Sequence, residues 1–166
     1  MRKRESGKWA ANAEPRQCIG PSDRRQAQQQ QVTTILSNPS LRTRVYRHFF
    51  NYQHWLDTVA DQQEAAGKDA SGLRHAFQKL LGFSDAEYQP IQASIDRVAT
   101  EMTDLQNEVK SNPGERADYA AARDQMIQAE IDTLNSNLSA KDNAAFEARL
   151  VQMFVPRQII QKEVQQ

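Results

Sequence analysis

The sequence predicts an all-α protein in which long antiparallel amphipathic helices form an elongated hairpin or bundle. Three separate segments carry apolar residues at steps of three and four, the spacing that places them on one side of a helix. Ser-x-x-acid motifs precede two of these helical segments, and Gly or Pro residues lie between the segments. Ala and Gln, with 21 and 20 copies, both favour helices.

The composition indicates a thin core. Leu, Ile, Val and Phe supply only 32 of the 166 residues, close to the level of about 20% below which highly charged chains are disordered. The net charge is zero, so disorder of the whole chain does not follow. No stretch is long and apolar enough to span a membrane. The single cysteine, Cys18, excludes an internal disulfide framework and a Cys-rich zinc site.

The charges are balanced only in sum. Residues 1–56 hold ten Lys and Arg against three acidic residues, whereas residues 57–166 hold eleven against eighteen. Oppositely charged parts attract each other within one chain or between two chains. The basic part therefore either docks on an acidic client, lipid or nucleic acid, or is neutralised by the acidic part of the same protein.

The chain divides into an arm, a helical domain and a tail. Residues 1–36 have no regular apolar period and contain four consecutive glutamines, so they are predicted to form a disordered, basic, Gln-rich arm. Residues 37–156 form the predicted helical domain, and residues 157–166 form a tail. The basic start of the chain is not followed by an apolar stretch, so the sequence as written shows no secretory signal.

The first long helix is predicted to run from about Leu41 to Ala66. Asn38 and Pro39 form its start signal, and Gly67 ends it. At 1.5 Å per residue, 26 residues reach roughly 39 Å, which is ordinary for an elongated bundle. The apolar stripe of this helix consists of Leu41, Val45, Phe49, Tyr52, Leu56 and Val59.

Residues 45–56 of this helix contain five of the chain's twelve aromatic residues. The apolar side chains therefore extend around more of the helix circumference than one neighbouring helix can cover. One interpretation is a binding or dimerisation surface with aromatic and Arg anchors, and the other is a helix buried on two sides within the bundle. The anchors predicted under the first interpretation are Arg44, Arg47, Phe49, Phe50, Tyr52, Trp55, Met102 and Met126.

A short helix is predicted over residues 73–81, and a glycine ends it. Ser84 and Glu87 then form a capping box, in which the Ser side chain accepts from the third backbone N–H of the helix and the Glu side chain reaches back. The helix that follows extends to about Ser111 with a heptad-like stripe. Pro90 conflicts with this helix near its first turn, because it removes one backbone hydrogen bond.

A turn at residues 112–114 separates this helix from one predicted over about residues 115–137. A short connection between two long amphipathic helices implies an antiparallel hairpin. Ser139 and Asp142 repeat the cap and begin a last helix, which Pro156 ends or kinks.

The two capped turns also repeat each other. Residues 83–87 match residues 138–142 as apolar-Ser-x-x-acid, and in both cases a second apolar residue follows the first by eight positions. This pattern resembles the paired L-T-x-x-Q motifs of the periplasmic Spy/CpxP family of small helical stress proteins, over about residues 41–155. The motif differs here, since Ser replaces Thr and an acidic residue replaces Gln at both sites. Residues 67–74 are also similar to uncharacterised bacterial proteins that are predicted to be exported.

The resemblance implies an all-α protein that forms a concave homodimer. Such a protein either binds unfolded or misfolded proteins without ATP, or inhibits a sensor of envelope stress. The resemblance also implies a periplasmic location. If the start of the sequence as written is correct, the absence of a signal peptide instead predicts a cytoplasmic location. Some relatives bind metal through His-rich segments, which this chain lacks, so no metal or cofactor is expected. The predicted function is therefore non-catalytic, chaperone-like binding of unfolded or partner proteins.

Other classes of function stand against this prediction. An enzyme is not expected, because H-E-x-x-H, G-x-S-x-G and Cys/His patterns are absent. His48 and His54 are six residues apart, whereas a metal shared on one helix needs a spacing of four. Nucleic-acid binding through the basic part is disfavoured, because its basic residues are scattered. A dimeric helical adaptor or regulator with one dedicated protein partner is the main alternative.

Overall fold

A computed structural model describes residues 20–155 of the chain, apart from the side chains of residues 115–117. All regular elements in this range are helices, so the predicted all-α class is confirmed. The first nineteen residues of the predicted arm, including Cys18, and the predicted tail lie outside the described residues. The helices are α1 (Pro21–Ser37), α2 (Pro39–Ala65), α3 (Ser71–Arg74), α4 (Ala76–Leu81), α5 (Asp85–Ser111), the 3-10 helix η1 (Pro113–Glu115), α6 (Arg116–Asn137) and α7 (Ala140–Phe154).

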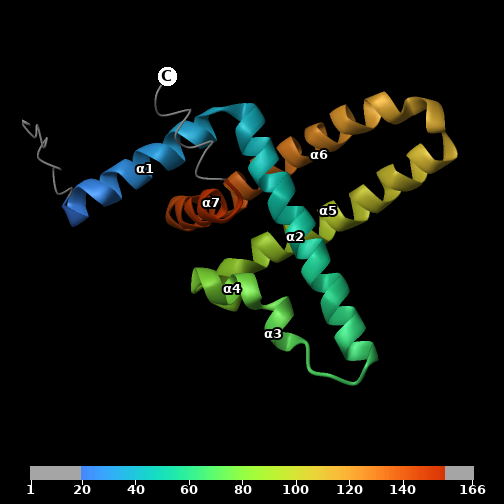
Figure 1. Cartoon of the computed structure of the whole chain (residues 1–166), viewed down its shortest axis with the longest axis horizontal. Coiled ribbons are helices and arrows are strands. Elements are labelled where there is room, and N and C mark those ends of the chain that lie inside the picture. The colour runs from blue at the N-terminus through green and yellow to red at the C-terminus, as the bar shows by residue number, and fades with distance from the viewer. Residues whose placement is uncertain (1–19, 156–166) are drawn as a thin grey trace, which may run out of the picture.

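Figure 1 shows how these helices are arranged. α5 and α6 lie side by side in opposite directions and are joined by η1 at one end of the molecule. α2 crosses the other half of this pair, and α1 extends away at the end opposite to η1. α3 and α4 connect the far end of α2 to α5. Because α2 contacts α1, α5, α6 and α7, it is the central helix of the fold.

The helix starts follow the predicted caps. Asn38 begins α2, and its Oδ1 accepts from the N–H of Leu41 at 3.2 Å. Ser84 begins α5: its Oγ accepts from the N–H of Glu87 at 3.4 Å, and its own N–H donates to Glu87 Oε2 at 2.8 Å. The predicted capping box is therefore confirmed.

The second Ser cap and the two helix-ending glycines are also present. Ser139 Oγ accepts from the N–H of Asp142 at 3.1 Å at the start of α7. Gly67 and Gly82 have φ values of +74° and +70°, in the left-handed region that residues with a Cβ rarely adopt. The cap residues thus stabilise helix termini, which is a local structural role.

The structure differs from the prediction in the arm. Residues 21–37 form α1, whereas the absence of an apolar period predicts disorder up to residue 36. Gln and Ala have high helix propensity, and in the first turn Asp23 Oδ2 accepts from the N–H of Gly20 at 3.2 Å. Only the last turns of α1 pack on the core, mainly through the buried Ile35. Propensity and one short apolar contact therefore suffice to form this helix.

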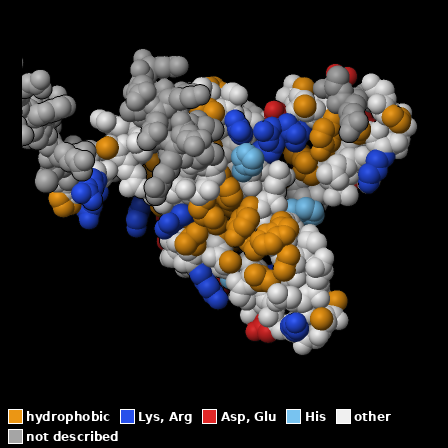
Figure 2. All heavy atoms as spheres, in the orientation of Figure 1, with side chains coloured by type: hydrophobic (Ala, Val, Ile, Leu, Met, Phe, Trp, Pro, Cys, Tyr) orange, Lys and Arg blue, Asp and Glu red, His pale blue; other side chains and the backbone are white. Residues whose placement is uncertain are grey.

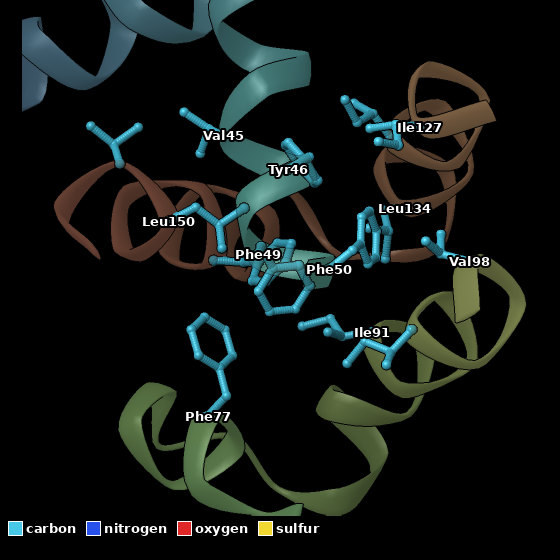
Figure 3. Packing of buried hydrophobic residues seen from close by; sticks show 14 of the residues in the cluster. Val45, Tyr46, Phe49, Phe50, Phe77, Ile91, Val98, Ile127, Leu134 and Leu150 are labelled. Carbon is cyan, nitrogen blue, oxygen red and sulfur yellow. The ribbon is translucent and has the colours of Figure 1, made fainter. Parts of the chain in front are cut away.

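The core is built around aromatic side chains of α2 (Figure 3). The Phe49 ring lies 4.9 Å from that of Phe77 in α4 and 5.2 Å from those of Phe50 and of Phe146 in α7, between centroids. Tyr46 packs edge-on against Phe146 at 5.9 Å. Phe49 and Tyr46 are 0% exposed. In this part of α2 the second interpretation of the aromatic tract therefore holds, that of a helix covered on two sides.

The apolar stripe of α5 is buried only in its first half. The four stripe residues up to Val98 are buried, whereas the three from Met102 onward are partly exposed. Val98 lies where α2 meets α5, since it lines one cavity with Phe50 of α2. The end of α5 next to η1 lies beside α6 (Figure 1). α5 continues through Pro90, so the conflict that this residue predicts does not end the helix.

Replacing Phe49 by Ala removes the ring that joins α2 to α4 and α7. We expect the free energy of unfolding to fall by about 3–5 kcal/mol, the range for a fully buried aromatic side chain. Urea unfolding followed by circular dichroism measures this change. Trp55→Ala is the matched control, because Trp55 is 56% exposed and its loss should cost about 1 kcal/mol or less. Equal losses in the two variants would contradict the core described above.

Replacing Ser84 by Ala removes the side-chain acceptor at the start of α5. We expect the free energy of unfolding to fall by about 1 kcal/mol, measured by urea unfolding. Ser136→Ala is the control, because the exposed Ser136 hydroxyl donates only to the Asp132 carbonyl within α6. A Ser84→Ala protein as stable as the wild type would show that the cap contributes nothing to α5.

Candidate functional site

One side of α2 borders the surface over most of the length of the helix. Residues spaced by three and four positions share one side of a helix. Phe154 of α7 lies beside the middle of this row, with its ring centroid 5.8 Å from that of Tyr52. The row, called the α2 strip below, consists of Leu41, Arg44, Val45, His48, Tyr52 and Trp55.

At one end of the α2 strip, three aromatic rings form a surface cluster. Tyr52 stacks on Trp55 with a centroid distance of 5.9 Å and contacts Phe154 on its other side. Trp55, Leu80 of α4 and Met153 of α7 are the exposed large hydrophobic residues of the described chain. Figure 2 shows hydrophobic side chains gathered at the centre of this face, over the region where α2, α4 and α7 meet.

At the other end of the α2 strip, the surface is hollowed. A pocket of about 260 Å³ lies between the last residues of α1 and α7 and the first turns of α2. Ile35, Val45 and Phe154 form its apolar wall, and the exposed Arg44 and His48 stand at its edge. Because Phe154 lines the pocket and also contacts Tyr52, the pocket and the aromatic cluster form one continuous surface.

The charged groups beside the strip are basic. Within the described residues, Arg44, Lys79 and Arg149 have no carboxylate within ion-pair distance. Arg149 Nη2 instead lies 3.5 Å from the Leu80 carbonyl oxygen. Burial, together with the charges of Arg47 and Arg44, lowers the pKa of His48, so His48 is neutral near pH 7. The arginines that pair with carboxylates are Arg42, Arg47, Arg74, Arg97 and Arg123.

The structure brings together only some of the predicted anchors. Arg44, Tyr52 and Trp55 lie on the α2 strip. Phe49 and Phe50 are 0% and 5% exposed, which corrects their predicted place on an accessible surface. The physical reason is that α4 and α7 cover the Phe49 side of α2, while α5 covers the Phe50 side.

The remaining predicted anchors lie away from the strip. Arg47 Nη1 pairs with Asp124 Oδ1 of α6 at 3.2 Å. Met102 is partly buried and, with Phe50, lines a small cavity of about 70 Å³ between α2 and α5. Met126 packs partly buried against the core. The predicted anchors therefore do not form one surface.

The sequence analysis did not include Phe154, Leu80 and Met153 among the anchors. Phe154 and Leu80 continue the apolar stripes of their own helices, a pattern that predicts burial. Both lie in the last turns of their helices, where Leu80 is 44% exposed and Phe154 is half-buried. The sequence feature that could have indicated their accessibility is their position at the ends of predicted helices.

A buried carboxylate joins α7 to α2. Glu147 is 9% exposed, and its Oε1 accepts from Tyr46 Oη and from Arg42 Nε, each at 3.0 Å. Burial raises the pKa of Tyr46, and the neighbouring Glu147 carboxylate raises it further. The guanidinium of Arg42 compensates the charge of Glu147, so this group acts as a polar clamp between helices.

A second buried carboxylate joins α6 to α5. Glu130 accepts from Ser94 Oγ at 2.5 Å and pairs with Arg97. A nucleophile beside a base is the arrangement that covalent catalysis needs. Ser94 is 0% exposed, however, and its hydroxyl has no access to a substrate. This arrangement therefore supports helix packing.

Within residues 20–155, no group of three or more His, Cys, Asp or Glu side chains is placed to hold a metal ion. No helix of the same range combines the length and apolar character that crossing a membrane requires. Comparison of the chain with protein-family models, curated proteins and solved structures finds no match. The resemblance to the Spy/CpxP family remains a prediction from the sequence.

The raised pKa of Tyr46 makes stability depend on alkaline pH. The folded state holds the phenol proton more tightly than the unfolded state, in which the Tyr pKa is about 10. This contribution to stability is fully present below pH of about 10 and is lost as the pH rises above it. We expect the urea midpoint to fall between about pH 9 and 11, and to fall less steeply in Tyr46→Phe. Equal slopes in Tyr46→Phe and in Tyr119→Phe, a partly exposed control on α6, would contradict this linkage.

Proposed function

We propose that this protein binds apolar segments of unfolded or non-native proteins without catalysis and without ATP, as a holding chaperone does. The observation that supports the proposal is the surface cluster of the exposed Trp55 and the half-buried Tyr52 and Phe154 beside an apolar pocket. A contiguous exposed apolar surface with a polar rim is typical of sites that bind other proteins. Trp and Tyr also rank among the side chains that contribute most to such contacts.

Binding at this surface relies on the removal of apolar area from water. Each Å² of apolar surface buried by a bound segment contributes about 25 cal/mol. Lost translational freedom and ordering of the segment offset several kcal/mol of this gain. The expected affinity is therefore weak, and release of the client needs no energy source.

We also propose that two copies associate as a homodimer through the elongated α5–α6 hairpin. Leu105 and Val109, the last stripe residues of α5, are partly exposed, and the end of α5 next to η1 projects beyond α2. Packing of a second hairpin against them completes a four-helix arrangement. The periplasmic location is proposed from the resemblance to the Spy/CpxP family alone.

The alternative function is a dimeric adaptor or regulator with one dedicated partner. The pocket beside Phe154 favours this alternative, because a concave site selects one side chain better than a flat surface does. Weak nucleic-acid binding through the basic amino-terminal part is the third candidate. A steep loss of affinity with rising salt is its signature.

The proposal is tested by suppression of aggregation. We expect the protein, at equimolar ratio and without ATP, to reduce the light scattering of a chemically denatured client after dilution. Trp55→Ala removes the most exposed aromatic anchor, so about fivefold more of this variant should be needed for the same effect. Tyr119→Ala, an aromatic substitution on α6 away from the strip, is the matched control and should act as the wild type does.

Two results would count against the chaperone-like function. Absence of suppression at several-fold excess would exclude it and favour the adaptor, which captures one partner with saturable binding. Suppression that Trp55→Ala leaves intact would show that clients bind elsewhere. Circular dichroism of each variant establishes that the substitution leaves the helices folded.

A further inference from the structure

We propose that the α2 strip selects apolar segments that carry acidic side chains, an inference that rests on the proposed function and adds a partner chemistry to it. The preferred partner is an extended segment with two large apolar side chains four residues apart, which share one face, and acidic residues beside them. One apolar side chain enters the pocket next to Phe154, and the other covers Trp55.

The charges around the strip are the first argument. Arg44 stands at the edge of the pocket, and Arg149 of α7, the helix that carries Phe154, lies 3.5 Å from the carbonyl oxygen of Leu80, the residue after Lys79. None of these three has an ion-pair partner within the described chain. In Figure 2, Lys and Arg side chains border the central hydrophobic region, and the few visible acidic side chains lie farther out.

The acidic residues of α2 do not neutralise this charge. Asp57, Asp61 and Glu64 all lie beyond the strip and surround Arg74 of α3, at 3.8, 2.6 and 2.8 Å. Arg74 thus compensates part of their charge at the far end of α2. The surface that faces a bound segment is therefore basic, which attracts acidic segments and repels basic ones.

The spacing of the two apolar contacts is the second argument. Val45 lines the pocket, and Trp55 lies ten residues farther along the same helix. At 1.5 Å per residue, this separation is about 15 Å along the helix axis. An extended chain rises about 3.3 Å per residue and its side chains alternate between two faces, so positions four apart lie about 13 Å apart on the same face. Side chains four positions apart in such a segment thus reach both contacts, since the pocket extends along α2 from Leu41 to His48.

Three labelled peptides of about ten residues test the inference by fluorescence anisotropy. Each carries two phenylalanines four positions apart, and the flanking positions hold Glu, Gln or Lys. At about 50 mM salt we expect the Glu peptide to bind roughly tenfold more tightly than the Lys peptide, with the Gln peptide between them. This difference should shrink at about 300 mM salt, where screening is stronger.

The outcomes separate the two proposals. Equal affinity for all three peptides would overturn the charge preference and leave the proposed function standing. Failure of all three peptides to bind at millimolar concentration would overturn both. Preference for the Lys peptide would overturn the charge preference alone.

Charge reversal at the pocket provides an independent test. Arg44→Glu should reduce the preference for the Glu peptide by about tenfold at low salt and so bring the Glu and Lys peptides to similar affinity. Arg24→Glu, at an exposed position of α1 that does not line the pocket, has the same change in net charge and should keep the wild-type preference. Identical peptide affinities in the two variants would show that net charge, rather than the strip, decides selection.

Discussion

The contact of Phe49 with Phe77 and Phe146 holds together three helices that lie far apart along the chain. The protein has few large apolar residues, so a cluster of rings that each bury a large area contributes much of the core. Through this cluster α7 is held beside α2, and Phe154 thereby reaches Tyr52 and the pocket. The accessible surface is thus a consequence of the core.

Two buried carboxylates fix how the helices sit on this core. Glu147 joins α7 to Arg42 and Tyr46 of α2, and Glu130 joins α6 to α5. Removing a carboxylate from water is costly, and its partners must compensate the charge in one geometry. Such groups add little net stability. A helix that shifts relative to its neighbour, however, separates the carboxylate from its partners and leaves a buried charge unpaired, which is strongly destabilising. We infer that they select one register among the similar packings that amphipathic helices allow.

The two sides of α2 perform different tasks. Tyr46, Phe49 and Phe50 are buried against neighbouring helices, whereas Tyr52 and the exposed Trp55 form a surface cluster beside Phe154 at the end of α7. The basic charge of the first part of the chain divides in a similar way. Arg42 and Arg47 pair with acidic residues of α7 and α6, and these pairs neutralise part of the charge asymmetry within the chain. Arg44 remains at the surface.

Local sequence patterns predict most of the described helices. The Ser84 and Ser139 caps, the glycine ends and the stripes depend on contacts within a few residues, so local patterns predict them. Helix α1 was missed because propensity, rather than periodicity, forms it. The accessibility of the aromatic residues, in contrast, depends on the packing of the whole fold. Phe49 and Trp55 occur in the same tract, and their exposure depends on where α4, α5 and α7 pass, a long-range outcome that no local pattern contains.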